Sequence, residues 1–184
     1  MLRRVVVKGS SGAGKSTLGR ELARRLHVPF VELDALHHGP NWTEASAEEL
    51  CARVAAALDD QRGWVVDGNY DSKLGELVVA RAELVIWLDL PLLTKLVRLT
   101  RRTLQRWWRA EELWNGNRET LSGVFWGKDA LFTWSLHQHF AHRRMWPQRF
   151  SQVAQVRLCT AREVSEWLAQ FDPLPAAQSE SQRH

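Results

Sequence analysis

Near its amino end the chain reads Gly9-Ser10-Ser11-Gly12-Ala13-Gly14-Lys15-Ser16-Thr17. This stretch satisfies the pattern GxxxxGK[ST], which is typical of a loop that binds nucleotide phosphates. Its glycines let successive backbone N–H groups point inward, and a helix that starts near Lys15 directs its positive end at the same phosphates. We therefore expect the whole stretch to bind a nucleotide, with Lys15 reaching the β- and γ-phosphates during catalysis and Ser16 coordinating Mg²⁺.

The residues around this loop predict a strand before it and a helix after it. Val5-Val6-Val7 form the centre of a short apolar strand, and apolar residues recur at helical spacing after Lys15. Short apolar runs continue to alternate with amphipathic stretches, which indicates parallel strands joined by helices. The expected strands span 3–8, 30–33, 64–67, 84–89 and 153–158, and the expected helices span 15–26, 46–58, 94–109, 129–146 and 161–171.

This alternation predicts an α/β fold, a three-layer α/β/α sandwich around a five-stranded parallel sheet. Ser46 and Glu49 form a possible capping box at one helix start, and Pro147 is expected to end another helix. We expect one domain over residues 1–171, followed by a flexible tail over residues 172–184.

Composition and length predict an ordinary single domain. The chain has 184 residues, of which 45% are hydrophobic and 25% charged. Only three apolar residues follow one another at the start, too few for a signal peptide, and no run is long enough to cross a bilayer. We therefore expect a cytoplasmic protein without membrane contacts. The two cysteines, Cys51 and Cys159, are far apart and predict neither a disulfide framework nor a zinc site.

Positive charge is concentrated between Arg98 and Arg149, where 10 basic residues face 4 acidic ones. Six of the tryptophans lie in the same half of the chain, and arginines interleaved with aromatic residues can bind nucleic acid. Packing is the commoner role of such tryptophans, and no known nucleic-acid-binding motif is present. The six are Trp107, Trp108, Trp114, Trp126, Trp134 and Trp146.

Together with the phosphate-binding loop, several further segments resemble the adenylate-kinase-like small kinases. Within that group the chain is similar to the adenylate-kinase-related family called DNA topology modulation protein. The matching segments are Leu33-Asp34-Ala35-Leu36, Trp64-Val65-Val66-Asp67-Gly68-Asn69-Tyr70, and Leu88-Asp89-Leu90-Pro91 followed by an arginine-rich helix.

The resemblance implies an ATP- and Mg²⁺-dependent kinase with an acceptor-binding segment after the second strand and a helical lid over about residues 105–128. It implies that lid arginines close over ATP and stabilise the transferring phosphoryl group. The candidates are Arg101 and Arg102 for catalysis and Arg106 for nucleotide binding, with Arg109 and Arg118 as further candidates.

Two departures from adenylate kinases concern the acceptor. Asn69-Tyr70 stands where those enzymes have a Pro-Arg pair that grips a nucleoside monophosphate, and residues 27–52 contain no lysine or arginine. This pattern favours a small hydroxyl-bearing acceptor over a phosphorylated one. Asp34, at a strand end, is the candidate that takes or orients the hydroxyl proton. The expected substrate-binding residues are Asp34, His37, Trp42, Asp67, Asn69 and Tyr70, with His38 beside them.

Two carboxylates are candidates for the magnesium side of the site. Asp67 is preferred, together with the Ser16 hydroxyl, and Asp89 is the alternative. The chain lacks the NKxD motif of many GTPases, which favours ATP over GTP. The sequence thus predicts ATP-dependent phosphoryl transfer to a small molecule. The alternatives are a nucleoside monophosphate kinase and a nucleotide-gated nucleic-acid-binding protein.

Overall fold

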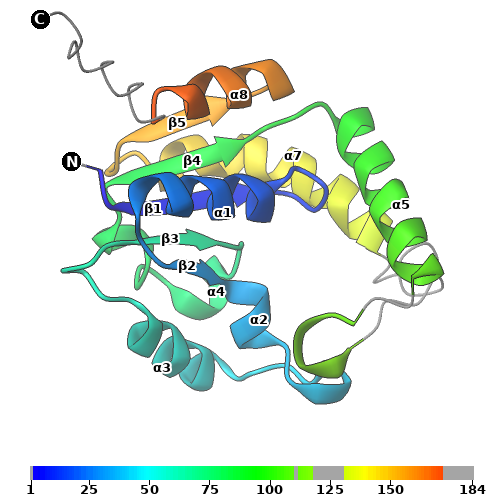
Figure 1. The fold of residues 1–184 in the computed structure, drawn as a ribbon, viewed down its shortest axis with the longest axis horizontal. Coiled ribbons are helices and arrows are strands. Elements are labelled where there is room, and N and C mark those ends of the chain that lie inside the picture. Colours follow the sequence, from blue (N-terminus) through cyan, green and yellow to red (C-terminus); the bar gives the residue numbers. More distant parts are fainter. Residues whose placement is uncertain (1, 110–111, 118–130, 172–184) are drawn as a thin grey trace, which may run out of the picture.

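The computed structural model describes residues 2–109, 112–117 and 131–171. Their centre is a five-stranded, all-parallel sheet in the order β2-β3-β1-β4-β5 (Figure 1). This confirms the predicted α/β fold. The strands are β1 (Arg4–Gly9), β2 (Phe30–Glu32), β3 (Trp64–Asp67), β4 (Leu84–Leu88) and β5 (Gln155–Leu158).

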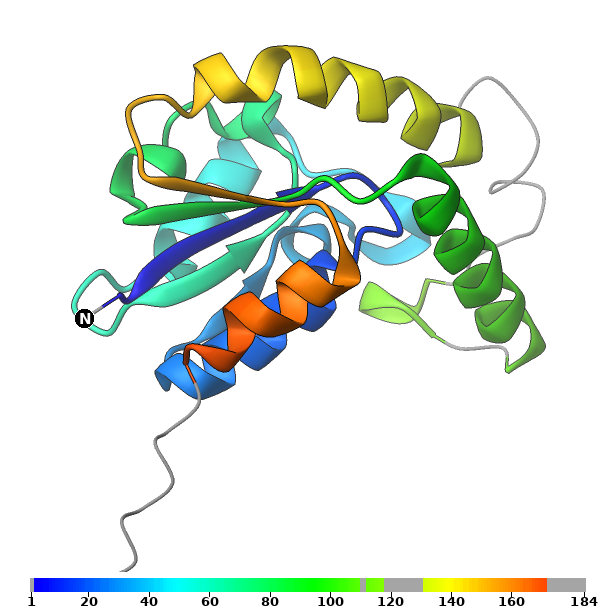
Figure 2. The ribbon, with the colours of Figure 1, turned by 90° about the horizontal axis from the view of Figure 1, so that it is seen from above.

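Helices cover both faces of this sheet, because successive strand residues alternate between two apolar clusters. Val5, Val7 and Ile86 pack against α1 (Lys15–Leu26) and α8 (Ala161–Ala169). Val6 and Val66 face the opposite cluster, which includes residues of α3 (Ala47–Ala57), α4 (Asp71–Leu74) and α7 (Leu131–Arg149). Figure 2 shows α7 on one side of the sheet and α1 beside α8 on the other.

The helix α3 begins after Ser46, as the predicted capping box indicates. The Ser46 hydroxyl accepts a hydrogen bond from the Glu49 N–H, and the Glu49 carboxylate accepts one from the Ser46 N–H, which together form a complete capping box. The second strand is shorter than predicted, because Leu33 already belongs to α2 (Leu33–His37). A short turn of 3₁₀ helix, η1 (Pro40–Trp42), follows α2.

The helix α5 (Leu92–Trp108) starts directly after Pro91 and leads away from the sheet (Figure 1). Its buried residues Lys95, Leu99 and Thr103 lie four apart, so they share one face of the helix. The predicted lid over about residues 105–128 therefore begins inside α5 and includes η3 (Trp114–Gly116). Arg118 and most of the remaining lid lie outside the described residues, as do the residues of the predicted tail.

The prediction that Pro147 ends its helix was wrong, because α7 continues through it to Arg149. Trp146 and Phe150 on both sides of the proline are buried in the core, and the Phe150 N–H donates to the Trp146 carbonyl at 3.1 Å. Burial of these two aromatic side chains offsets the loss of one backbone donor at the proline.

A last short element, η2 (Val79–Arg81), leads into β4. Among the described residues, no helix combines the length and the apolar content that crossing a membrane requires. The carboxyl ends of β1, β2 and β3 meet at one edge of the sheet, where a ligand crevice is expected in open α/β folds.

Candidate active site

A cleft of about 1510 Å³ opens at this carboxyl edge of the sheet. One half is lined by Ser11–Thr17 and by one face of α5, and we call it the donor half. The other half, the acceptor half, is lined by residues of five short segments from distant parts of the chain. Its lining residues are Glu32, Asp34, His37, His38, Trp42, Glu44, Tyr70, Glu112, Leu113 and Trp114.

The phosphate-binding loop has the backbone conformation that its glycines permit. Gly12 has φ 78° and Gly14 has φ 94°, both in the left-handed region. A Cβ atom at Gly12 would lie 2.4 Å from the Lys95 carbonyl oxygen, so the loop packs closely against α5. Because α1 begins at Lys15, its first N–H groups have no partner within the helix and can bind an anion.

Asp67 is the carboxylate that the fold places beside this loop. It ends β3 next to Val7 of β1, is fully buried, and neither carboxylate oxygen has a hydrogen-bond partner among the described residues. Burial raises the pKa of Asp67 to about 6, although the nearby Lys15 ammonium and Ser16 hydroxyl oppose the rise. Unpartnered oxygens beside a hydroxyl are donors that suit a hard cation such as Mg²⁺.

The chain contributes few direct metal ligands. Within the described ranges no group of three His, Cys, Asp or Glu residues has a geometry that could hold a metal ion. A magnesium ion here would therefore depend on nucleotide phosphates and water for most of its ligands, as is usual for this ion.

Asn69 was predicted to contact the substrate, but the structure places its side chain elsewhere. Its amide nitrogen donates to the Gly9 carbonyl at 2.8 Å, and it does not line the cleft. Beside it, the buried Lys8 ammonium donates to the Gly68 carbonyl at 2.9 Å and to Asp71 at 2.7 Å. These bonds join the segment after β3 to the base of the phosphate-binding loop.

The acceptor half is organised by a hydrogen bond between Tyr70 and Asp34. The Tyr70 hydroxyl donates to Asp34 Oδ1 at 2.6 Å and lies 3.4 Å from His38 Nε2. Burial and the negative charge of Asp34 raise the pKa of Tyr70, so the phenol stays protonated and donates. The described residues offer Asp34 Oδ2 no hydrogen-bond partner, and Asp34 lines the same cleft as Lys15.

His37 is more buried than a loop histidine usually is, with 2% of its surface exposed. Its Nε2 lies 3.4 Å from both Lys73 Nζ and Glu44 Oε2, whereas its buried Nδ1 has no hydrogen-bond partner among the described residues. Burial, assisted by the charge of Lys73, lowers the pKa of His37, so the neutral ring is favoured at neutral pH.

One row of arginines on α5 faces the cleft. Arg98, Arg102 and Arg106 are spaced four residues apart and all line it, and Arg98 Nη1 lies 3.4 Å from the Ala13 carbonyl oxygen, to which it donates. Arg101 and Arg109 are exposed and are not among the lining residues. Two of the predicted α5 arginines, Arg102 and Arg106, thus line the cleft. Arg98, which was not predicted, lines it as well.

Asp89, the alternative magnesium carboxylate, lies in a different environment. It is buried and accepts hydrogen bonds from Arg143 at 2.9 Å and from Arg157. These contacts place it in an ion-pair cluster that joins β4, β5 and α7, away from the lining of the cleft.

The tryptophans of the basic half divide by environment. Trp146 packs in the core and Trp114 lines the cleft, whereas Trp107 and Trp108 are exposed on α5. The side chains of Trp126 and Trp134 lie outside the described part of the chain. Packing therefore accounts for some of these residues but not for the pair on α5.

Sequence reasoning missed several residues that line the cleft. Glu32 precedes Asp34 by two residues and accepts a hydrogen bond from Arg20 at 2.7 Å. The spacing of Arg98, Arg102 and Arg106 was a usable signal, because positions four apart share a helix face. The other missed lining residues include Glu44, Glu112, Leu113 and, from α8, Ala161, Val164, Ser165 and Leu168.

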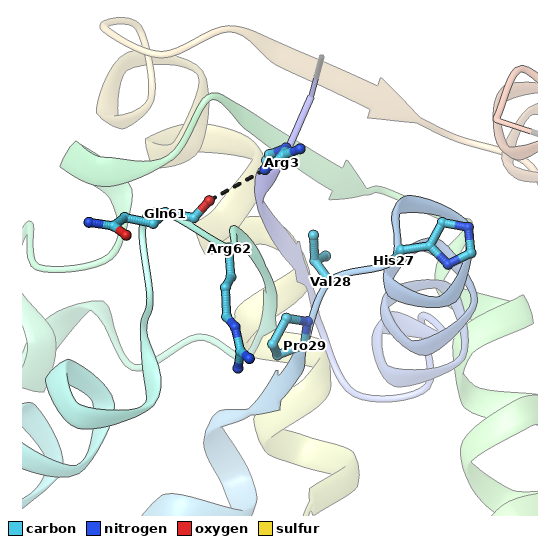
Figure 3. A pocket seen from close by; sticks show the side chains of 6 residues that line it. All are labelled: Arg3, His27, Val28, Pro29, Gln61 and Arg62. Atoms are coloured by element: carbon cyan, nitrogen blue, oxygen red, sulfur yellow. Dashed lines mark hydrogen bonds between the residues drawn. The ribbon is translucent and has the colours of Figure 1, made fainter.

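A smaller pocket of about 560 Å³ lies at the opposite, amino edge of the sheet (Figure 3). Arg3, Pro29 and Arg62 line it, and Arg3 Nη1 donates to the Gln61 carbonyl at 3.4 Å. It contains none of the predicted site residues and no carboxylate. Of these two pockets, the one at the carboxyl edge therefore holds the candidate chemistry.

Comparisons with known proteins agree with this geometry. Residues 11–41, which include most of the loop together with Asp34 and His37, match the family described as shikimate kinase. Two shikimate kinases from Bacteroides fragilis are 58% identical over 31 residues, which is 17% of this chain and 17% of theirs. The chain thus spans only a small part of those relatives. A shikimate kinase from Sulfurihydrogenibium sp. is 30% identical over 111 residues, or 53% of this chain and 67% of the relative.

Solved structures share the fold over nearly the whole chain. A shikimate kinase from Acinetobacter baumannii in complex with shikimate has a TM-score of 0.56 and 15% identity, covering 93% of this chain and 91% of its own. A gluconokinase from Sinorhizobium meliloti 1021 has a TM-score of 0.50 and 21% identity, covering 92% and 93%. Together with the sequence match over two thirds of a curated relative, the loop and the fold show that the chain belongs to the shikimate-kinase-like family of P-loop small-molecule kinases.

Proposed function

We propose that the protein transfers the γ-phosphoryl group of ATP to a hydroxyl group of a small molecule, with Mg²⁺. The observation that carries this proposal is the position of Asp34, hydrogen-bonded to Tyr70, in the same cleft as the phosphate-binding loop. A carboxylate and a phosphate cradle in one cleft are the two parts that phosphoryl transfer to a hydroxyl needs.

The donor half binds and neutralises the triphosphate. Backbone N–H groups of the loop and the Lys15 ammonium hold the β- and γ-phosphates, and the α5 arginines stabilise charge on the transferring group. Ser16 and Asp67 are the residues that would hold Mg²⁺, Asp67 acting through water, and the ion when bound neutralises phosphate charge. Arg102 and Arg106 support this role because they line the cleft, and Arg98 joins them.

The acceptor half prepares the nucleophile. The acceptor hydroxyl donates its proton to Asp34 as its oxygen forms a bond to the γ-phosphorus. The bond between that phosphorus and the β–γ bridging oxygen breaks, and ADP leaves. Tyr70 holds Asp34 in position through the 2.6 Å hydrogen bond. His37, Trp42 and the other lining residues contact the rest of the acceptor.

The finer resemblance, to the DNA topology modulation proteins of the adenylate-kinase group, is part of this proposal. It is supported by the segments around Asp34, Asp67 and Asp89. The proposal also favours an unphosphorylated acceptor over a nucleoside monophosphate, because residues 27–52 contain no lysine or arginine. Arg53, just after them, is exposed and donates to the Leu36 carbonyl.

A coupled ADP-release assay tests the proposal. The purified protein, MgATP and a panel of hydroxyl compounds are combined; the panel contains shikimate, which the curated relatives' names suggest, together with gluconate, sugars, polyols, nucleosides and AMP. We expect at least one hydroxyl compound to raise ADP release well above slow hydrolysis by water. No acceleration by any of them, from protein that binds MgATP, would contradict the kinase proposal.

Nucleic-acid binding is a second candidate function, favoured by the exposed Trp107 and Trp108 beside the exposed Arg101 and Arg109 on α5. Its affinity for single-stranded DNA or RNA would fall steeply as salt rises. A salt titration with a fluorescent oligonucleotide tests it, and absence of binding at moderate salt would exclude it.

A further inference from the structure

Two short loops from distant parts of the chain are hydrogen-bonded together over the acceptor half. Asn117 Oδ1 accepts from the Trp42 N–H at 2.8 Å, and its Nδ2 donates to the Gly39 carbonyl at 2.9 Å. Asn115 Nδ2 donates to the His38 carbonyl at 2.5 Å. We call residues 38–42 and 114–117, with these bonds, the clasp. Because residues 114–117 follow α5, the clasp attaches part of the predicted lid directly to the acceptor half.

The clasp brings aromatic rings around the space next to Asp34. The Trp114 ring is stacked on His38, with ring centroids 6.1 Å apart and an interplanar angle of 23°. The Trp42 ring meets His38 edge-on at 5.3 Å. The Tyr70 ring is close by, because its hydroxyl donates a hydrogen bond to Asp34. We call these four cleft-lining side chains the aromatic cage: His38, Trp42, Tyr70 and Trp114.

The backbone of the clasp is strained, so other contacts must stabilise its conformation. Asn41 has φ 55°, Trp42 has φ 57° and Asn115 has φ 56°, all in the left-handed region, which is costly for a bulky residue such as tryptophan. The Asn117 bonds oppose this cost because they fix the Trp42 N–H and the Gly39 carbonyl. Asn117 itself is buried, with 4% of its surface exposed.

The charges around the cage disfavour an anionic ligand. Its charged lining side chains include the carboxylates Glu32, Asp34 and Glu44 and the guanidinium of Arg20. The nearby cations already pair with two of them: Arg20 lies 2.7 Å from Glu32 and Lys73 lies 3.0 Å from Glu44. A ligand carboxylate or phosphate in the cage would therefore meet the like charge of Asp34 and would find Arg20 and Lys73 already paired.

Polar groups next to the cage suit hydroxyl groups. Carboxylate oxygens accept hydrogen bonds from hydroxyls, and His37 Nδ1 is a buried polar atom without a hydrogen-bond partner among the described residues. Aromatic faces pack against the apolar C–H surface of a ring, while a few polar groups fix its orientation.

We propose that the aromatic cage binds an uncharged, polyhydroxylated ring, one hydroxyl of which faces Asp34, and that Asn117 is the positioning residue that closes the cage over it. The proposal rests on the proposed function for its reacting hydroxyl and names the class of acceptor. The transfer step is the one given above, with the hydroxyl proton passing to Asp34 and ADP leaving.

Matched ligands test the class of acceptor. D-Glucose and myo-inositol are compared with the carboxylates D-glucuronate and shikimate and with the amine D-glucosamine. Binding is followed by tryptophan fluorescence with ADP and Mg²⁺, and transfer by ADP release from MgATP. We expect an uncharged ring to bind and to react at least about tenfold better than the charged compounds.

The outcomes separate this inference from the proposed function. If the protein prefers a carboxylate or the amine, or if neither uncharged ring binds saturably, the inference about the cage is wrong. Phosphoryl transfer is then still tested by the ADP-release assay described above. Saturable binding of an uncharged ring, with no transfer to that ring or to any other compound tested, supports the cage and contradicts the kinase proposal.

The role of Asn117 is tested with Asn117→Asp, which keeps the oxygen that accepts from Trp42 but removes the donor to Gly39. We expect the KM for the ring acceptor to rise about tenfold and the KM for MgATP to stay within about twofold. The matched control Gln148→Glu makes the same amide-to-carboxylate change at an exposed position of α7 outside the cleft and should leave both values unchanged.

A merely structural role for Asn117 would lower kcat and thermal stability without separating the two KM values, and that result would overturn the assignment. If Asn117→Asp does not fold, Trp114→Leu carries the test, because it removes one wall of the cage and leaves the backbone of the clasp in place. An unchanged acceptor KM in folded Trp114→Leu would then contradict the cage.

Discussion

The donor and acceptor halves of the cleft are built in different ways. The donor half consists mainly of one continuous stretch, Ser11–Thr17, together with one face of α5. The acceptor half draws on short segments around residues 32–38, 42–44, 70 and 112–114, which the clasp and the Asp34–Tyr70 hydrogen bond hold together. Under the proposed function, a local motif determines where the phosphates bind, whereas long-range contacts determine what receives the phosphoryl group.

This difference explains how one fold can serve several acceptors. The loop geometry follows from glycines and a helix start, so it is preserved wherever the motif occurs. The acceptor half depends on side chains of loops, which can change without disturbing the sheet. Substitutions in the two halves should therefore have separable effects on ATP and on acceptor.

The largest effect is expected from Lys15→Ala in the donor half. Loss of the ammonium should lower kcat/KM by about 10⁴-fold, because this charge is needed where the γ-phosphate gains charge during transfer. Folding should change little, since Lys15 lines the cleft and is only partly buried.

ADP release and a thermal melt measure both quantities for Lys15→Ala. Arg62→Ala, at the amino edge of the sheet, removes a cation that lies far from the loop and is the control. Retained activity in folded Lys15→Ala would contradict the role of the donor half in binding the triphosphate.

In the acceptor half, Asp34→Asn should lower kcat by about 10³-fold, because the amide cannot take the hydroxyl proton. The amide oxygen still accepts from Tyr70, so the local structure is retained. Affinity for MgATP, measured by calorimetry, should stay within about twofold. Glu48→Gln, the same change at an exposed position in the first turn of α3, is the control. Loss of ATP binding in Asp34→Asn would show that the two halves are not separable.

Much of the donor half could be predicted from the sequence. The phosphate-binding stretch, the helix from Lys15 to Leu26 and the strand that ends at Asp67 all depend on local patterns of glycine, charge and apolar residues. The rotation of α5 was missed. Arg101 was expected in the site, but the burial of Lys95, Leu99 and Thr103 turns Arg98, Arg102 and Arg106 toward the cleft instead.

The acceptor half was less predictable. Asp34, His37, Trp42 and Tyr70 were identified because they follow strands or occupy a segment without basic residues. Asn117 was not, because its hydrogen bonds join backbone atoms 75 and 78 residues away and leave no periodic signal. Asn69 was assigned to the substrate, although its amide bonds the base of the phosphate-binding loop.

Asp67 adds a pH-dependent difference between the two halves. Its folded-state pKa of about 6 lies above the ordinary value of 3.8, so the folded protein holds this proton more tightly than the unfolded chain. The stability that this group contributes is complete below pH 3.8 and is lost as the pH rises through about 6.

Asp67→Asn should therefore stabilise the nucleotide-free protein at pH 7.5 by about 2 to 3 kcal/mol, with almost no difference at about pH 3. Urea unfolding at the two pH values measures this, and stabilisation by MgATP should be lost in the variant. Equal stability of both proteins at pH 7.5 would contradict the buried, unpartnered state of Asp67.

The smallest expected effect on kcat is the difference between substitutions at two adjacent arginines of α5. Arg102→Ala should lower kcat about 20-fold, because this side chain lines the cleft and can bond the transferring group. Arg101→Ala should change kcat by less than about twofold, because its side chain is exposed. Steady-state kinetics of both variants decide this, and equal losses would show that the lid presents a different face of α5 during catalysis.

Calorimetric titration with a non-hydrolysable ATP analogue and Mg²⁺ tests the central claim most directly, because it needs no knowledge of the acceptor. The folded protein should bind one nucleotide per chain, and Lys15→Ala should bind it far more weakly. Heat no greater than dilution from folded wild-type protein, or equal affinity in Lys15→Ala, would contradict the claim that Gly9–Thr17 holds the triphosphate.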